Sequence, residues 1–327
     1  MALYDLPLDE LRGYRPDRNE PADFDAFWSR TLGEARARSS PAEFRPLDTA
    51  LTTVDVSDVT FAGFGGDQIR GWLVLPRHRV GRLPGVVEYL GYGRGRGDPM
   101  EWLTWASFGY AHLVVDARGQ GGQWSAGDTV DPAPPDAPHH PGFVTRGIGD
   151  RDHYYYRRLI TDAVLAVDAA QTQPAIDPER VVVAGTSQGG GLALAVAGLH
   201  PGVAALLCDV PFLSDVRRAT EITDTNPYAE IAGYLRIHRD AVDRVFETLS
   251  YVDGVNFAAR ASAPALFSVG LMDPICPPST VFAAFNHYAG AREIDVWPYN
   301  GHDGGGIHHQ RARIAFLERE GLAGVRV

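Results

Sequence analysis

The stretch VVVAGTSQGGG, residues 181–191, decides the fold of this chain, and LALAVAGL follows it directly. Four apolar residues in a row, Val181 to Ala184, are typical of a strand in the buried centre of a parallel sheet. Gly185 and Gly189 flank Ser187, and small residues there let a strand and a helix approach while the serine sits on a strained turn. The stretch therefore predicts a reactive serine between a buried strand and a helix.

Outward from this stretch, strand-like and helical segments alternate from residue 100 onward. They are EWLTWASFG, AHLVVD, a helix near 155–172, VVVAG, GGGLALAVAGL and, after a charged stretch, ALFSVG at 265–270. Such alternation indicates βαβ units, and so an α/β protein with a mostly parallel central sheet and helices on both faces. Upstream, strand-type runs begin at about residue 50, and residues 5–40 show helical spacing with Asp23 as the expected N-cap.

The chain is expected to form a single α/β domain over residues 1–327. Residues 1–45 are predicted to be an N-terminal helical extension, and residues 212–260, charged and helical in pattern, a helical insertion near the active-site edge before the strand at 265–270. The tract DPAPPDAPHHPG at 131–142 contains too much proline for a helix or a strand. Long ordered loops of this kind are often functional or interfacial.

Composition excludes several classes of function. The net charge is −11, so a general attraction to nucleic acid or anionic lipid is not expected. The sequence contains no lysine, which excludes Schiff-base chemistry and the lysine of a P-loop. The opening residues lack the apolar core of a signal peptide, no stretch reaches membrane-spanning length, and there are only two cysteines. We therefore expect a cytoplasmic protein with reduced thiols.

A serine hydroxyl is a weak nucleophile, so Ser187 needs a histidine base and a carboxylate that orients it. In hydrolases with this kind of elbow, the acid and then the histidine follow on loops after later strands. Asp273 fits the acid because it comes just after the strand-like ALFSVG and before Pro274. Asp253, inside the insertion, and Asp209, soon after the elbow helix, are weaker candidates.

His302 is the best-placed base, because it lies in the turn NGHDGG after the strand-like REIDVWPY. His308 and His309 lie in the helix that follows, where we expect them to face solvent or a subunit boundary. A metal site built from His302, Asp303 and this pair is the alternative. It is disfavoured because two adjacent histidines cannot both face one site from a helix.

Acyl transfer also needs backbone donors for the oxyanion. One is the amide after the nucleophile, which belongs to Gln188. The second is expected from the glycine-rich loop VVEYLGYGRGRG at 86–97, where Tyr92 is our candidate. The same loop is a weak match to a dinucleotide-binding motif, because no acidic residue follows at the expected distance. No cofactor is expected.

Several long motifs resemble the acetyl xylan esterase and cephalosporin C deacetylase group, carbohydrate esterase family seven, of the α/β-hydrolase superfamily. They are DLPLDELRGYRP with DFDAFW, GYGRGRGDPMEWLTWASFGY, Arg118-Gly119-Gln120, GTSQGG around Ser187, and GLMDPICPPST with NHY. They span nearly the whole chain in the right order.

This resemblance implies deacetylation of small acetyl esters by Ser187, Asp273 and His302, with oxyanion donors at Tyr92 and Gln188. It also implies a ring-shaped homo-hexamer whose active sites face an internal cavity, with the tract at 131–142 as a candidate for subunit contacts. Arg118 is expected to be structural.

Two positions depart from the family pattern. Asp303 stands where the family often has glutamate, and Leu90 where it commonly has histidine. Neither is a member of the predicted triad, so the expected reaction is unchanged. The two differences bear on substrate preference instead. The alternatives to an esterase are a peptidase or acyltransferase of the same fold, and a non-catalytic hydrolase-like binding protein.

Overall fold

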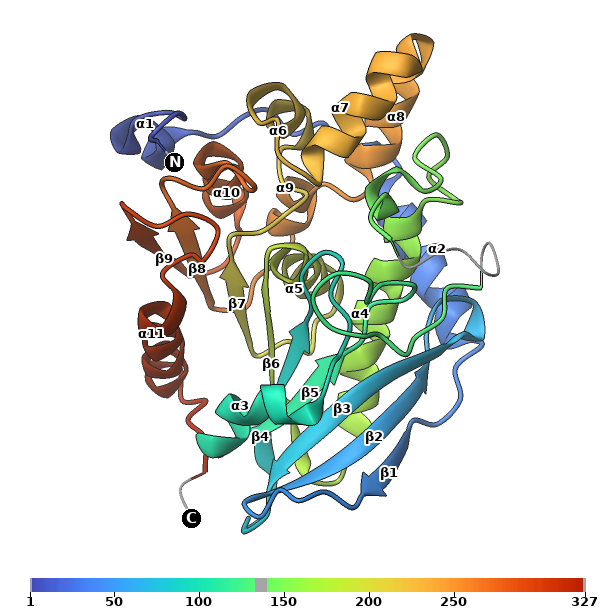
Figure 1. Cartoon of the computed structure of the whole chain (residues 1–327), viewed down its shortest axis with the longest axis vertical. Helices are drawn as coiled ribbons and strands as arrows, with labels where there is room; N and C mark the ends of the chain where they lie inside the picture. Colours follow the sequence, from blue (N-terminus) through green and yellow to red (C-terminus); the bar gives the residue numbers. More distant parts are fainter. Residues whose placement is uncertain (1, 133–139, 326–327) are drawn as a thin grey trace.

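The computed structural model describes residues 2–132 and 140–325, and its centre is a nine-stranded sheet (Figure 1). Along the sheet the strands lie in the order β1-β2-β3-β5-β4-β6-β7-β8-β9. The pairs β1·β2, β2·β3 and β3·β5 are antiparallel. The pairs β5·β4, β4·β6, β6·β7, β7·β8 and β8·β9 are parallel. The strands are β1 (Glu43–Leu47), β2 (Val54–Ala62), β3 (Gln68–Pro76), β4 (Leu83–Tyr89), β5 (Ala111–Val115), β6 (Ile176–Thr186), β7 (Ala205–Asp209), β8 (Ala265–Gly270) and β9 (Arg292–Trp297).

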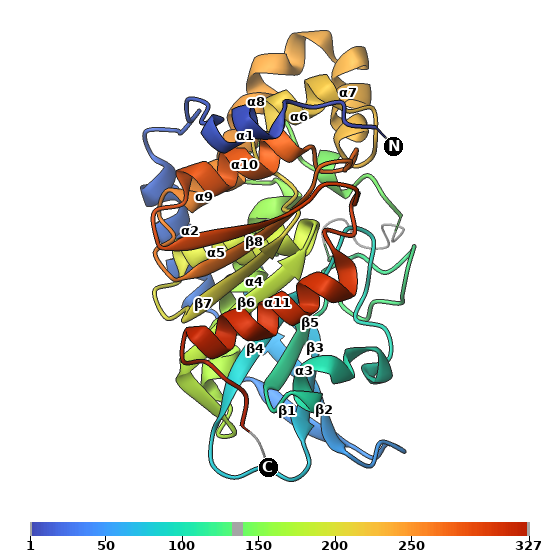
Figure 2. The ribbon, with the colours of Figure 1, turned by 90° about the vertical axis from the view of Figure 1, so that its left-hand side faces the viewer.

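Helices cover both faces of this sheet, as predicted (Figure 2). On one face α4 (Tyr155–Thr172) and α5 (Gln188–Leu199) pack against the central strands, with α2 (Phe24–Arg36) on α4 and α9 (Gly254–Ala258) on α5. On the other face lie α3 (Leu103–Ser107) and α11 (Gly306–Arg319). The fold is therefore the α/β arrangement, with a mostly parallel sheet and helices on both faces, that the alternation of segments indicated.

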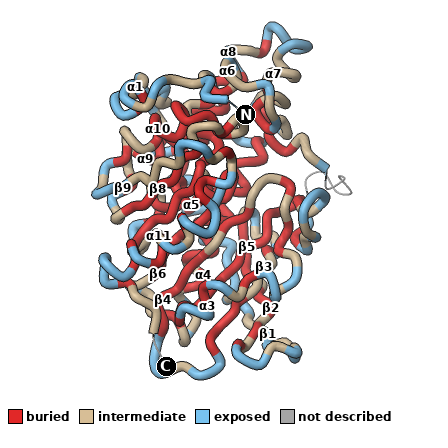
Figure 3. The backbone as a smooth tube through the Cα atoms, turned by 60° about the vertical axis from the view of Figure 1, so that its left-hand side comes forward, coloured by how far each residue is buried: buried red, intermediate tan, exposed pale blue. Residues whose placement is uncertain are grey.

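The central strand β6 shows why its sequence is a continuous apolar run. Val181 and Val183 pack into the core on the α4 and α5 side, and Val182 and Ala184 pack into the core on the α11 side. Successive side chains of a strand point to opposite faces, so a strand covered on both faces needs apolar residues at every position. Figure 3 shows the buried central strands together with α5.

The first part of the chain is helical, with α1 (Leu8–Gly13) and α2. Phe24, Phe27, Trp28 and Leu32 of α2 are all buried, as their spacing predicted. The expected cap is not formed, because the Asp23 carboxylate pairs with Arg151 instead. The sheet also begins earlier than residue 50, because its first strand is β1 at Glu43–Leu47. This edge strand is exposed and its burial pattern does not alternate.

Residues 212–260 form four helices, α6 (Val216–Ile222), α7 (Tyr228–Ile237), α8 (Val242–Ser250) and α9. In Figure 1 α6, α7 and α8 lie beyond the carboxyl ends of the parallel strands. Helix α10 (Pro278–His287) follows β8, and short 3-10 turns occur at Phe64–Gly66, Pro99–Trp102, Phe143–Thr145 and Arg239–Ala241. The insertion thus stands over the edge of the sheet at which ligands bind in α/β folds.

Cys208 and Cys276 are both buried and free. Within the described ranges, none of the helices has the length and apolar character that crossing a membrane requires. The cytoplasmic location stays a prediction. The proline-rich tract at 131–142 lies mostly outside the described residues, which omit 133–139, so its predicted subunit contacts stay a prediction too.

Candidate active site

Ser187 lies on the sharp turn between β6 and α5, and its backbone has φ +61° and ψ −120°. This strained conformation is the one expected of a nucleophile elbow. A Cβ atom on Gly185 would lie 2.3 Å from the Gly189 backbone, and one on Gly189 would lie 2.1 Å from the Tyr89 carbonyl oxygen. Both glycines are therefore needed for the strand and helix to approach, as the sequence predicted.

Asp273 and His302 form a hydrogen-bonded pair beside this turn. Asp273 is fully buried just after β8, and its Oδ2 lies 2.8 Å from Nδ1 of His302. Its Oδ1 accepts the backbone N–H groups of Ile275 (2.8 Å) and Cys276 (3.1 Å). The loop thus fixes the orientation of the carboxylate, and because Nδ1 of His302 is bound, Nε2 is the ring atom left for a reacting group.

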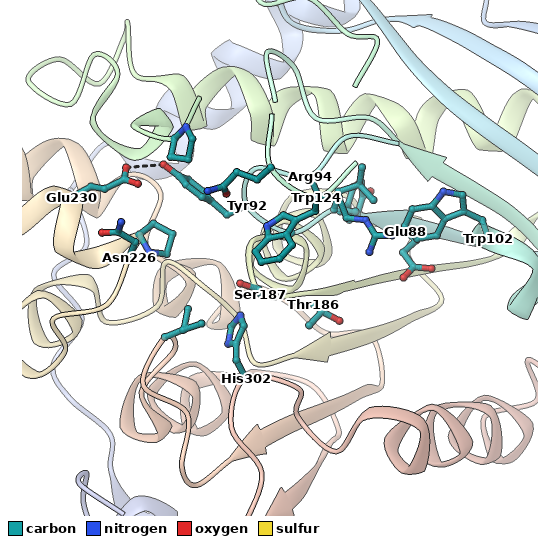
Figure 4. Close-up of a pocket in the computed structure, with 17 residues that line it drawn as sticks. Glu88, Tyr92, Arg94, Trp102, Trp124, Thr186, Ser187, Asn226, Glu230 and His302 are labelled. Atoms are coloured by element: carbon teal, nitrogen blue, oxygen red, sulfur yellow. Dashed lines mark hydrogen bonds between the residues drawn. The ribbon is translucent and has the colours of Figure 1, made fainter. Parts of the chain in front are cut away.

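Ser187 and His302 line the same cavity, and Figure 4 shows the imidazole directed toward the serine. In the described part of the chain, however, no hydrogen bond joins the two side chains. Catalytic hydrogen bonds are often loose without substrate and tighten in the complex.

The two amides predicted to bind the oxyanion come from adjacent segments. Gln188 is the first residue of α5, so the helix itself offers its amide no acceptor. Tyr92 lies on the loop after β4, the strand next to β6. Side-chain amides join this loop to the elbow: Gln188 Nε2 donates to the Leu90 carbonyl (3.1 Å), and Gln120 Oε1 accepts from the Gly93 amide (2.6 Å).

The cavity over Ser187 has a volume of about 480 Å³, which suits a small molecule. Its lining is largely apolar and aromatic: Tyr89, Leu90, Tyr92, Trp102, Trp124, Pro141, Pro227 and Ile275. Leu90, where the family commonly has histidine, is thus part of the cavity wall. Among the described residues of the lining, the acidic and basic ones besides His302 are Glu88, Arg94 and Glu230.

Glu230 of α7 is a cavity residue that the sequence analysis did not identify. Its Oε2 accepts the Tyr92 hydroxyl at 2.7 Å (Figure 4), while the same hydroxyl accepts the Gly142 and Val144 amides at 3.1 and 3.3 Å. Burial raises the pKa of Glu230. The helical insertion therefore contacts the loop that carries the proposed oxyanion donor, and no local pattern around residue 230 signals this.

The two weaker candidates for the acid, Asp253 and Asp209, are engaged elsewhere. Asp209 Oδ1 lies 2.8 Å from Nε2 of His309. Asp253 caps α9 and accepts the amides of Asp215 and Val216, and burial raises its pKa to about 6.

Asp303 bonds its own turn, at the Gly301 amide and the Asn300 side chain. The interpretation of Arg118 as structural agrees with its surroundings, because this buried guanidinium pairs with Asp162 at 2.5 Å and lies outside the cavity lining.

The expectation that His309 faces solvent or a subunit boundary is wrong. Its ring is 2% exposed and joins two strands, with Nε2 2.8 Å from Asp209 Oδ1 and Nδ1 3.0 Å from Asp295 Oδ2. Burial disfavours the charged ring, but Asp209 and the two hydrogen bonds outweigh it and raise the pKa to about 9, against a smaller opposing effect of Arg313. Its neighbour His308 is exposed, as predicted.

We expect His309 to make stability fall in alkaline solution. The pKa of His309 is about 9 in the folded protein, against an ordinary value of 6.5, so its stabilisation is complete below pH 6.5 and is lost as pH rises through 9. The loss in the free energy of unfolding should be on the order of 3 kcal/mol. Urea unfolding from pH 6 to 9.5 measures it. His308→Asn should retain this loss and His309→Asn should lack it; an equal loss in both variants would contradict the assignment.

The four residues of the alternative metal site do not converge. His302 bonds Asp273, Asp303 bonds its own turn, and His309 lies between Asp209 and Asp295. Across residues 2–132 and 140–325 there is no group of three or more histidine, cysteine, aspartate or glutamate side chains arranged to hold a metal ion.

Residues 1–320 match the family described as acetyl xylan esterase (AXE1). Among curated proteins, the acetyl esterase Axe7A of Xylanibacter ruminicola is 30% identical over 292 residues, which are 88% of this chain. The matched region covers 65% of the length of that relative.

Two solved structures are similar over almost their full length. An acetyl xylan esterase from Paenibacillus sp. R4 superposes with a TM-score of 0.89 and 39% identity, and acetyl xylan esterase 1 from Thermoanaerobacterium sp. JW/SL YS485 with a TM-score of 0.86 and 34% identity. Each comparison covers 96% of this chain and 99% of the other. The resemblance seen in the sequence motifs thus extends to the tertiary structure.

Proposed function

This chain belongs to the acetyl xylan esterase family, and from that premise we propose that it is a serine esterase that removes acetyl groups from small esters. The observation that carries the proposal is the buried Asp273–His302 hydrogen bond at the cavity that also contains Ser187. A nucleophile, a base and an orienting acid on three separate loops are the parts that acyl transfer requires.

In the proposed mechanism, Nε2 of His302 takes the Ser187 proton while Oγ attacks the acetyl carbonyl carbon. The amides of Gln188 and Tyr92 stabilise the negative charge on the carbonyl oxygen. His302 then gives its proton to the leaving alcohol, and an acetyl-enzyme remains. A water molecule that loses its proton to His302 attacks this intermediate, releases acetate and restores Ser187.

We propose acetylated xylo-oligosaccharides and cephalosporin C-like acetates as substrates. A cavity of about 480 Å³ with aromatic walls can hold the alcohol part of such molecules. In the proposed ring-shaped hexamer, access to an internal cavity would favour small esters over polymers, a proposal that rests on the family resemblance. A peptidase or acyltransferase is not favoured, because both similar structures and the curated relative bear the names of acetyl esterases.

The choice of acyl group tests this proposal. Ser187 is only 8% exposed, and Leu90 and Ile275 line the same cavity, so each added methylene must find room between side chains. We expect kcat/KM for p-nitrophenyl acetate to exceed that for the butyrate by at least about tenfold. Initial rates across acetate, propionate, butyrate and the matching anilides measure it. Faster cleavage of the anilides would favour a peptidase, and no release of acetate from any ester would favour the binding-protein alternative.

A further inference from the structure

The segment before α1 contacts the loop that carries the acid. The Tyr4 hydroxyl donates a hydrogen bond of 2.7 Å to the backbone carbonyl oxygen of Asp273, 269 residues away. Burial, and then the neighbouring Asp5 and Asp273, raise the pKa of Tyr4, so its hydroxyl remains a donor. Figure 1 and Figure 2 place this part of the chain beside α10, the helix that follows the acid loop.

Asp5 contacts the other end of the same loop. Its side chain is 2% exposed, and its Oδ2 accepts the Ser279 amide at 2.7 Å. Its Oδ1 accepts Nη2 of Arg218 at 3.0 Å, and Nε of Arg218 donates to the Ser279 hydroxyl at 2.7 Å. The first residues of a helix have amides without partners inside the helix.

Helix α10 cannot satisfy this requirement locally. It begins at Pro278, its N-cap position is Pro277, and no side-chain cap is formed there. A proline has no hydroxyl or carboxylate with which to cap a helix. Asp5 therefore serves as the N-terminal cap of α10 from a distant part of the sequence, and a carboxylate at that end is also favoured by the helix dipole.

Tyr4 and Asp5 thus fix both ends of the loop 273–279, and Thr223 of the insertion adds a hydrogen bond to the Pro274 carbonyl. The position of this loop sets the direction of Asp273 Oδ2 toward His302. We propose that Tyr4 and Asp5 are positioning residues that hold the catalytic acid in line with His302. The inference rests on the proposed function for the role of Asp273, and it adds the segment before α1 to the structures on which catalysis depends.

The test compares Tyr4, before α1, with Tyr14, directly after it. Tyr4→Phe removes only the hydroxyl that holds Asp273, and Tyr14→Phe removes one that donates at 2.8 Å to Asp215, a residue outside the loop 273–279. For Tyr4→Phe with p-nitrophenyl acetate we expect kcat to fall about threefold to tenfold, the effect of one lost hydrogen bond, with KM unchanged. The acid limb of the pH profile of kcat/KM should move to lower pH, because a less well aligned Asp273 stabilises the imidazolium less.

Tyr14→Phe should leave kcat and the acid limb as in the wild type, whatever it does to the melting temperature. Asp5→Asn keeps an oxygen for the Ser279 amide and should retain more activity than Asp5→Ala. A Tyr4→Phe enzyme with lower melting temperature but unchanged kcat and pH profile would show a purely structural contact and overturn the inference alone. A wild-type protein inactive on all acetyl esters would instead overturn the proposed function, and the inference with it.

Discussion

Ser187→Ala is expected to lower kcat for p-nitrophenyl acetate by on the order of 10⁶-fold, because removal of the nucleophile of a serine triad leaves only binding and oxyanion stabilisation. The 2.9 Å hydrogen bond from its amide to the Asp209 carbonyl does not involve the side chain, so the turn should persist. Steady-state kinetics and titration with a serine-reactive phosphonate measure the loss of turnover and of covalent labelling.

A matched control is Ser107→Ala, at the end of α3, whose hydroxyl donates to the Leu103 carbonyl in its own helix. This variant should keep the wild-type kcat and should react fully with the phosphonate. Retention of more than about one hundredth of the activity in Ser187→Ala would mean that another group attacks the ester, and the proposed acetyl-enzyme at Ser187 would be abandoned.

Asp273→Asn should have the second largest effect, a fall in kcat on the order of 10⁴-fold. The carboxylate Oδ2 accepts the Nδ1 proton of His302, and an asparagine amide that donates there instead would hold the imidazole in the wrong tautomer. Because position 273 is fully buried, water cannot replace the carboxylate. Rate measurements together with the NMR shifts of the His302 ring protons would report both consequences.

Asp303→Asn is the control for this prediction, since that exposed carboxylate next to His302 bonds the turn and not the imidazole ring. Its activity should stay within about tenfold of the wild type, as befits the loss of one or two exposed hydrogen bonds. If the two variants lost equal activity, the carboxylate at 273 would have no special role, and the orienting acid would have to be sought elsewhere.

The sequence did not predict the contacts of the buried His309 ring or of the Glu230 carboxylate. One partner of His309 is Asp209, 100 residues earlier, and the partner of Glu230 is Tyr92, 138 residues earlier. On helical periodicity alone, His308 and His309 are equivalent, and only the packing of α11 on the sheet separates them. Edge strand β1 was missed for another reason, since it is exposed and lacks the alternation that identifies a strand.

The sequence by itself determined the alternation of strands and helices and the turn at Ser187, and it predicted the order of nucleophile, acid and base. These features depend on short-range patterns: apolar runs, glycines at a tight turn, and polar residues just after a strand. Tertiary structure alone decided that Tyr4 and Asp5 hold the acid loop and that Glu230 holds Tyr92. Contacts of this kind join residues whose distance is set by the folding of the whole chain, so no local pattern encodes them.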